Sequence, residues 1–97
     1  MTKIEILEYL QQNKSEFHSR YGVTKIGLFG SYARDQNNEE SDIDIVVEFL
    51  KEKKNLHTFL NLKREIETLL GKKVDLGIES ALKPIVKKYV EKEIIYV

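Results

Sequence analysis

Apolar residues recur at helical spacing near the start of the chain and again after its midpoint. Residues 2–5 (Thr-Lys-Ile-Glu) form a capping box, which predicts a helix over residues 3–20 that ends before Gly22. Asn55 is a favourable N-cap and predicts the start of a second helix over residues 56–70. The apolar positions expected to share the buried faces of these helices are Ile4, Leu7, Leu10, Phe17, Leu56, Phe59, Leu60, Ile66 and Leu70.

A third amphipathic stretch begins at Pro84. Proline suits the first turn of a helix, because the N–H groups of that turn have no intrahelical acceptor. The apolar residues that follow it recur at helical spacing, so they are expected to face the core: Ile85, Val86, Tyr89 and Val90.

Four short runs of apolar and β-branched residues lie between or after these helices. They predict strands over residues 25–29, 43–49, 73–77 and 94–97. A short helical turn is expected after the first strand, before a polar loop over residues 35–41. Because strands and helices alternate, the pattern predicts helices packed on one sheet, an α/β (α+β) fold.

Length and composition narrow the class of protein. The chain has 97 residues, which predicts a single domain over residues 1–97. Sixteen Lys and Arg balance sixteen Asp and Glu, so the net charge is zero and nonspecific nucleic-acid binding is disfavoured. The absence of Cys excludes a disulfide framework, and no apolar run reaches membrane-spanning length. A cytoplasmic protein with no membrane partner is the expectation.

Gly30-Ser31 marks the point where the first predicted strand meets a helix. Glycine allows the backbone to approach a ligand closely, and the amides there, with the Ser31 hydroxyl, form a natural phosphate-binding turn. An ordinary strand-to-helix turn with Ser31 as N-cap explains the same dipeptide. The dipeptide alone therefore does not decide between the two readings.

Three Asp residues lie in two of the predicted strands or directly at the start of one. Asp42 and Asp44 are two positions apart, so they point to the same side, where two carboxylates are costly unless a cation neutralises them. Their oxygens suit Mg²⁺, and a solvated strand end is the plain alternative. Asp75 lies in an apolar strand, where it either partners a cation or occupies an exposed face. Combined with a phosphate-binding turn, the three carboxylates suggest a two-metal phosphoryl-transfer site.

The spacing of these motifs resembles that of the DNA polymerase β-like nucleotidyltransferase superfamily. Gly30-Ser31, ten intervening residues and Asp42-Ile43-Asp44 match its signature, and the segment KKVDLG supplies a third acidic position at Asp75. The stretch GLFGSYARDQNNEESDIDIVVEF is most similar to the minimal nucleotidyltransferases of prokaryotes. The segment ALKPIVKKYVEKEIIYV resembles the usual C-terminal segment of that family.

The resemblance implies a mixed sheet flanked by helices and a Mg²⁺-dependent transfer of AMP from ATP, with release of pyrophosphate. It places Gly30 and Ser31 at the triphosphate. It also makes Asp42, Asp44 and Asp75 the catalytic residues and metal ligands, with two Mg²⁺ ions expected.

Arg34 matches the arginine of the family's Gly-Ser-x-Ala-Arg pattern, which implies a nucleotide-binding contact with phosphate. A salt bridge from Arg34 to the acidic loop is the alternative. The next residue departs from the family pattern, because Asp35 stands where glycine is common. Since Asp tolerates a left-handed backbone better than most residues, we expect the turn to survive.

Small members of this family are typically encoded beside a HEPN-domain protein and act with it as a toxin–antitoxin pair. The resemblance therefore implies an antitoxin that neutralises a HEPN toxin by adenylylating one of its tyrosines, by binding it, or both. The oligomeric state, as a homo- or hetero-oligomer, stays open. Two other functions stay open: a non-catalytic antitoxin that acts by binding alone, and nucleotidyl transfer to a small molecule or an RNA end. The acidic triad disfavours the first, and the zero net charge counts against RNA.

Overall fold

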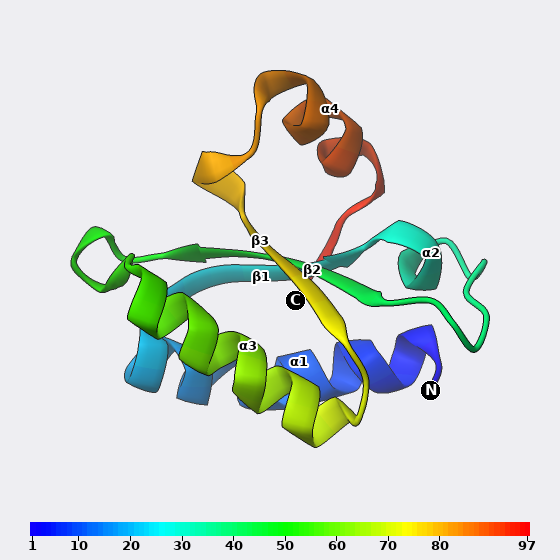
Figure 1. The fold of residues 1–97 in the computed structure, drawn as a ribbon, viewed down its shortest axis with the longest axis horizontal. Coiled ribbons are helices and arrows are strands. Elements are labelled where there is room, and N and C mark those ends of the chain that lie inside the picture. Colours follow the sequence, from blue (N-terminus) through cyan, green and yellow to red (C-terminus); the bar gives the residue numbers. More distant parts are fainter.

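The computed structural model describes residues 1–97 and contains a four-stranded mixed sheet with helices on both faces (Figure 1). β1 pairs antiparallel with β2 and with β4, whereas β2 pairs parallel with β3, in the spatial order β3-β2-β1-β4. The predicted α/β (α+β) fold with a mixed sheet is confirmed. The strands are β1 (Val23–Phe29), β2 (Ile43–Phe49), β3 (Val74–Ile78) and β4 (Ile95–Tyr96).

Two long helices cover one face of the sheet (Figure 1): α1 (Lys3–Tyr21) and α3 (Leu56–Leu70). Successive side chains of a strand point to opposite faces, so Ile43 and Ile45 enter this layer and Asp44 lies on the other face. The fully buried side chains of the layer include Ile6, Leu10, Phe17, Ile26, Leu28, Ile43, Ile45, Leu62 and Ile66.

The ends of both long helices follow the predicted local chemistry. The Thr2 hydroxyl accepts a hydrogen bond from the Glu5 N–H at 3.2 Å, and the Glu5 carboxylate accepts one from the Thr2 N–H at 2.9 Å. Asn55 caps α3 as predicted. Gly22 and Gly71 end the two helices with φ angles of +73° and +65°, which glycine adopts without steric cost.

Two apolar positions predicted to be buried on these helices are exposed instead. Ile4 is 64% exposed and Leu56 is 71% exposed, and each lies in the first turn of its helix. Leu62, which was not predicted as a core residue, is fully buried. No helix of the chain combines the length and the apolar character needed to cross a bilayer.

The other face of the sheet is only partly covered, by α4 (Pro84–Glu93) (Figure 1). The prediction that the apolar residues of α4 face inward is wrong for three of the four. Ile85, Val86 and Tyr89 are 79%, 43% and 70% exposed, and only Val90 is buried. Helical spacing locates an apolar stripe, but it does not determine what covers that stripe.

Short helical turns connect these elements. α2 (Gly30–Ala33) follows β1 directly, and η1 (Lys51–Lys53) follows β2. η2 (Glu79–Ala81) joins β3 to α4 and therefore sets where α4 begins over the open face.

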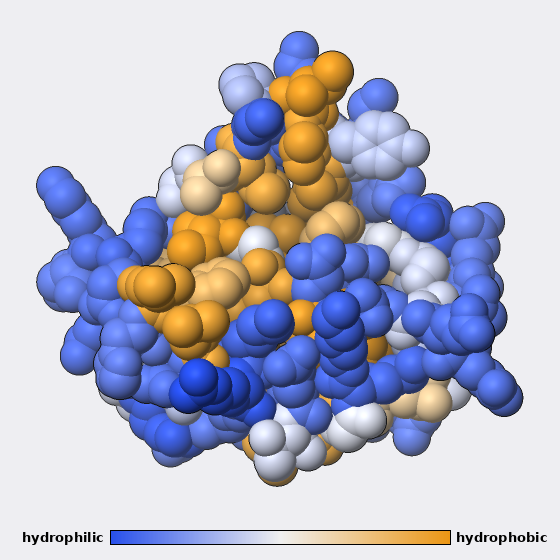
Figure 2. Space-filling view, viewed as in Figure 1, coloured by the Kyte–Doolittle hydropathy of each residue, from blue (hydrophilic) through white to orange (hydrophobic).

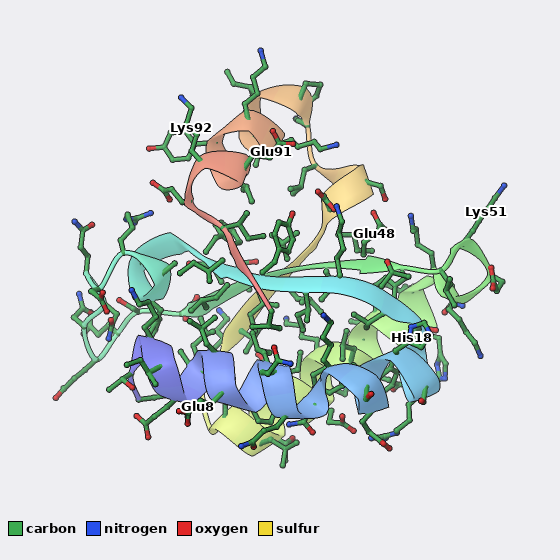
Figure 3. All side chains as sticks on the ribbon, turned by 180° about the vertical axis from the view of Figure 1, so that it is seen from behind. Glu8, His18, Glu48, Lys51, Glu91 and Lys92 are labelled. Atoms are coloured by element: carbon green, nitrogen blue, oxygen red, sulfur yellow. The ribbon has the colours of Figure 1, made fainter.

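Glu48 of β2 fixes η2 in place. Its carboxylate accepts a hydrogen bond from the Ser80 N–H at 2.9 Å and lies 2.6 Å from Lys54 Nζ; Figure 3 shows Glu48 between the sheet and η2. Burial alone would raise the pKa of Glu48, but hydrogen bonds from Lys54, the Phe49 N–H and Ser80 outweigh it and lower the pKa to about 2. Glu48 is therefore charged at neutral pH and holds η2 against the sheet.

Candidate active site

Three neighbouring strands place two predicted site residues, Asp44 and Asp75, in one row with Phe29 across the open face of the sheet. Phe29, the last residue of β1, pairs with Asp44 of β2, and Asp44 pairs with Asp75 of β3. Side chains paired in this way point to the same face, from strands about 4.8 Å apart. The row faces the side of α4, because Ile43 and Ile45 are buried in the opposite layer.

Gly30 packs directly against Asp44. Its backbone is left-handed, with a φ angle of +76°, and a Cβ at this position would collide with the Asp44 carboxylate. Any other residue would strain the backbone and displace that carboxylate. The strand-to-helix turn therefore passes within contact distance of an acidic side chain.

Ser31 is the second residue of α2 and is partly exposed. Phe29 occupies the N-cap position and makes no capping hydrogen bond with its side chain. The alternative reading of Ser31 as an N-cap is therefore wrong. Ser31 and Gly30 lie together at the turn, at the Phe29–Asp44 end of the row.

The three carboxylates give this end of the sheet a high negative charge. Asp44 is half-buried, and burial, followed by the charges of Asp75 and Asp42, raises the pKa of Asp44 to about 6, against an opposing effect of Arg34. Asp42 and Asp75 are exposed to solvent. Carboxylate oxygens are the donors that a hard divalent cation such as Mg²⁺ prefers, and neighbouring carboxylates repel one another without a cation, so these residue types fit the expected metal. No group of three or more His, Asp or Glu side chains is arranged so that it could hold a metal ion. Metal binding therefore stays a prediction.

Arg34 follows α2 and links it to α4. Its Nη1 donates to Glu93 at 2.7 Å, and its Nε donates to the Gln36 side chain at 3.1 Å. The alternative prediction, an ion pair between Arg34 and the acidic loop, is wrong, because Arg34 pairs with Glu93 and Glu93 belongs to α4. Arg34 is nevertheless close enough to the carboxylates for its charge to oppose the rise in the pKa of Asp44.

Asp35 takes the left-handed conformation that the family pattern assigns to glycine. Its φ angle is +58°, and no other non-glycine residue of the chain has a positive φ. The expectation that the turn survives the replacement is confirmed. The Asp35 carboxylate also pairs with Lys3 Nζ at 3.0 Å, which ties the turn to α1.

Phe29 is a site residue that sequence reasoning missed. It forms one wall of a cavity of about 280 Å³ between the sheet and α4, beside Asp44 in the row. The only signal in the sequence was its place directly before Gly30. The side chains that line the cavity are Phe29, Ile85, Val86, Tyr89 and Val90.

Comparison with known proteins identifies the family of this chain. A family model, the nucleotidyltransferase domain, matches residues 5–97. The chain belongs to the nucleotidyltransferase domain family. Protein adenylyltransferase MntA of Thermococcus cleftensis is 43% identical to this nucleotidyltransferase over 97 residues, which cover all of this chain and 97% of the relative.

Solved structures agree with this assignment. The structure of a proposed minimal nucleotidyltransferase superposes with a TM-score of 0.82 at 33% identity, over 98% of this nucleotidyltransferase and 95% of that chain. A tri-AMPylated Shewanella oneidensis HEPN toxin in complex with MNT antitoxin gives a TM-score of 0.62 at 21% identity, over 97% and 66% of the two chains. At that identity the second structure shows a shared fold alone. The chain is thus a minimal nucleotidyltransferase of the MntA-like protein adenylyltransferase type.

Proposed function

We propose that this nucleotidyltransferase transfers AMP from ATP to a tyrosine hydroxyl of a HEPN toxin and is the antitoxin of that pair. The observation that carries the proposal is the strand register that sets Asp44 beside Asp75 and against the Gly30 turn. Two similar proteins support the choice of a HEPN toxin as acceptor: one is a protein adenylyltransferase, and the other, similar in fold, is an MNT antitoxin in complex with a tri-AMPylated HEPN toxin.

ATP binding would be divided between the turn at Gly30 and Ser31 and the carboxylates of Asp42, Asp44 and Asp75, which we call the acidic row. Gly30 and Ser31 would hold the triphosphate, because the turn lets backbone amides approach phosphate oxygens closely. Asp42, Asp44 and Asp75 would hold Mg²⁺ through their carboxylate oxygens. When bound, the metal would neutralise the phosphates and favour deprotonation of the acceptor hydroxyl.

Asp75 lies on β3, at the edge of the sheet, and is exposed to solvent. An acceptor side chain can therefore reach it from outside, while the nucleotide occupies the β1 side of the row. In the reaction, the acceptor oxygen bonds to the α-phosphorus, the bond from that phosphorus to the pyrophosphate oxygen breaks, and the hydroxyl proton is released. Asp75 would orient the acceptor for this in-line displacement.

Arg34 would bind a phosphate oxygen of the nucleotide. Its ion pair uses Nη1 and its bond to Gln36 uses Nε, so Nη2 stays available as a donor. A guanidinium group suits phosphate because its donors form a planar fork. Glu93 would hold Arg34 in position for this contact.

The proposal is tested by separating catalysis from binding. The HEPN partner is treated with ATP, Mg²⁺ and either the wild-type chain or an Asp42→Asn, Asp44→Asn double variant, and its ribonuclease activity is then measured after the chain is removed. We expect lasting inhibition from the wild type and none from the double variant. Inhibition that needs the chain to remain present, and that the double variant reproduces, would support neutralisation by binding alone.

A further inference from the structure

An apolar cavity adjoins the acidic row on its β1 side, and the roles given above leave it unexplained. We propose that this cavity is a base seat, which holds the purine base of the nucleotide whose phosphates meet Gly30 and Ser31. The inference rests on the proposed function and extends it to nucleotide selection. The base seat comprises Phe29, Ile85, Val86, Tyr89 and Val90, around a volume of about 280 Å³.

The position of Phe29 connects the base seat to the phosphate turn. Phe29 directly precedes Gly30 in the chain and pairs with Asp44 across the sheet. Its ring therefore stands beside the carboxylate on one side and faces α4 on the other. Phe29 of the cavity and Gly30 of the turn are consecutive residues. A nucleotide with its phosphates at the turn would therefore reach this cavity with its base.

Three contacts hold α4 over the sheet and keep the base seat formed. At one end, Glu48 accepts the Ser80 N–H at 2.9 Å and so fixes η2. At the other end, Arg34 pairs with Glu93 at 2.7 Å. Beyond α4, a Cβ on Gly27 would lie 2.8 Å from Ile94 Cγ1, so glycine allows this segment to pack closely on β1. The helix is therefore anchored near both of its ends.

The exposed face of α4 is apolar and small, which suits a small aromatic ligand. Figure 2 shows hydrophobic side chains gathered over α4 and on the surface below it, while Figure 3 shows Glu91 and Lys92 on its C-terminal half, seen from behind. A stable protein interface buries about 800 Å² on each partner, which a ten-residue helix with three exposed apolar side chains does not provide alone. A base stacked between the helix and Phe29 covers such a patch without a large interface.

The lining also predicts how the base is selected. All five side chains of the base seat are aliphatic or aromatic, so they present π and apolar surface. Stacking on such surface is tolerant of base identity, because every base has a π face. The base seat should therefore accept adenine and guanine with affinities within about ten-fold of each other.

The test measures nucleotide binding without turnover. Calorimetry gives the affinities of Mg²⁺ complexes of AMP-PNP, GMP-PNP and inorganic tripolyphosphate, which has no base. A Val86→Ser, Tyr89→Ala double variant should bind AMP-PNP about ten-fold more weakly and tripolyphosphate as the wild type does. Tyr89→Phe, which keeps the ring, should bind both normally. Leu69→Ser is the matched control, because Leu69 is an exposed apolar residue of α3 on the opposite face (58% exposed).

Each outcome decides a separate claim. Equal weakening of AMP-PNP and tripolyphosphate, unchanged AMP-PNP binding by the double variant, or a purine preference above about a hundred-fold would overturn the base seat. Unchanged AMP-PNP binding together with lost labelling of a HEPN protein would make α4 a protein-docking face instead. A wild-type chain that binds neither AMP-PNP nor tripolyphosphate would contradict the proposed function itself.

Discussion

At the scale of single residues, Gly30 links backbone conformation to the acidic site. Replacement by Ala would add a Cβ that collides with the Asp44 carboxylate, on a backbone with a φ angle of +76°. We expect Gly30→Ala to lower the rate of AMP transfer at least about a hundred-fold, because a displacement of about 1 Å at a reacting group has that effect. The rate of labelling by ATP labelled at the α-phosphate measures it.

Gly71→Ala is the matched control for this change. Gly71 has a similar left-handed backbone, with a φ angle of +65°, but a Cβ there meets no atom within 4 Å. Both variants should lose about 1–2 kcal/mol of stability from backbone strain, and only Gly30→Ala should lose activity. Equal activity of the two variants at equal stability would contradict the role of Gly30 in positioning Asp44.

Arg34 offers a second prediction at this scale. Arg34→Gln and Glu93→Gln both break the ion pair, but only the first removes a phosphate donor. The pair is partly exposed, so Glu93→Gln should cost less than about 1 kcal/mol of stability. Arg34→Gln should raise the KM for ATP about ten-fold, as expected for a lost hydrogen bond to a charged group. Equal KM values in the two variants would indicate that Arg34 acts only through Glu93.

At the scale of the elements, Glu48 couples the position of η2 to pH. The pKa of Glu48 is lowered from 4.5 to about 2 in the folded chain, so its stabilising effect is present above pH 4.5 and is lost as the pH falls toward 2. Glu48→Gln should reduce the free energy of unfolding by about 1–2 kcal/mol at pH 7, after allowance for screening at the partly exposed Lys54. Urea unfolding at several pH values measures the difference.

The matched control for Glu48 is Glu52→Gln, since Glu52 is an exposed residue of η1. It should change the free energy of unfolding by less than about 0.5 kcal/mol at any pH. A difference between Glu48→Gln and the wild type that stays constant from pH 7 to pH 2 would show that charge is not what holds η2.

Local sequence patterns predicted the elements well wherever local chemistry determines them. The capping box at Thr2, the N-cap Asn55 and the left-handed turn at Asp35 all depend on atoms a few residues away. The inward face of α4 was predicted wrongly, because burial of Val86 and Tyr89 depends on what lies opposite the helix.

The candidate site shows the same division. Motif spacing identified the acidic residues, but the pairing of Asp44 with Asp75 and with Phe29 depends on strand register. The register between strands that are distant in sequence is determined in the folded chain, and no sequence signal near Phe29 predicts it. The cavity beside Phe29 could therefore not be predicted from the sequence.

At the scale of the whole molecule, one buried layer joins α1, α3 and the sheet. Its side chains form a single cluster of 18 buried residues, which spans the chain from Ile6 to Leu76. We therefore expect residues 1–97 to unfold in one cooperative step, with coincident transitions by circular dichroism and tyrosine fluorescence. Two separated transitions would contradict the prediction of a single domain.

The central claim is that the acidic row catalyses transfer of AMP to another protein. Intact-mass spectrometry of a HEPN partner, incubated with ATP, Mg²⁺ and about one hundredth of its molar amount of this nucleotidyltransferase, tests the claim most directly, because binding alone cannot act at that ratio. We predict that most of the partner gains the mass of AMP with the wild type and none with Asp44→Asn. A partner left unmodified by the wild type, or modified equally by Asp44→Asn, would contradict the claim.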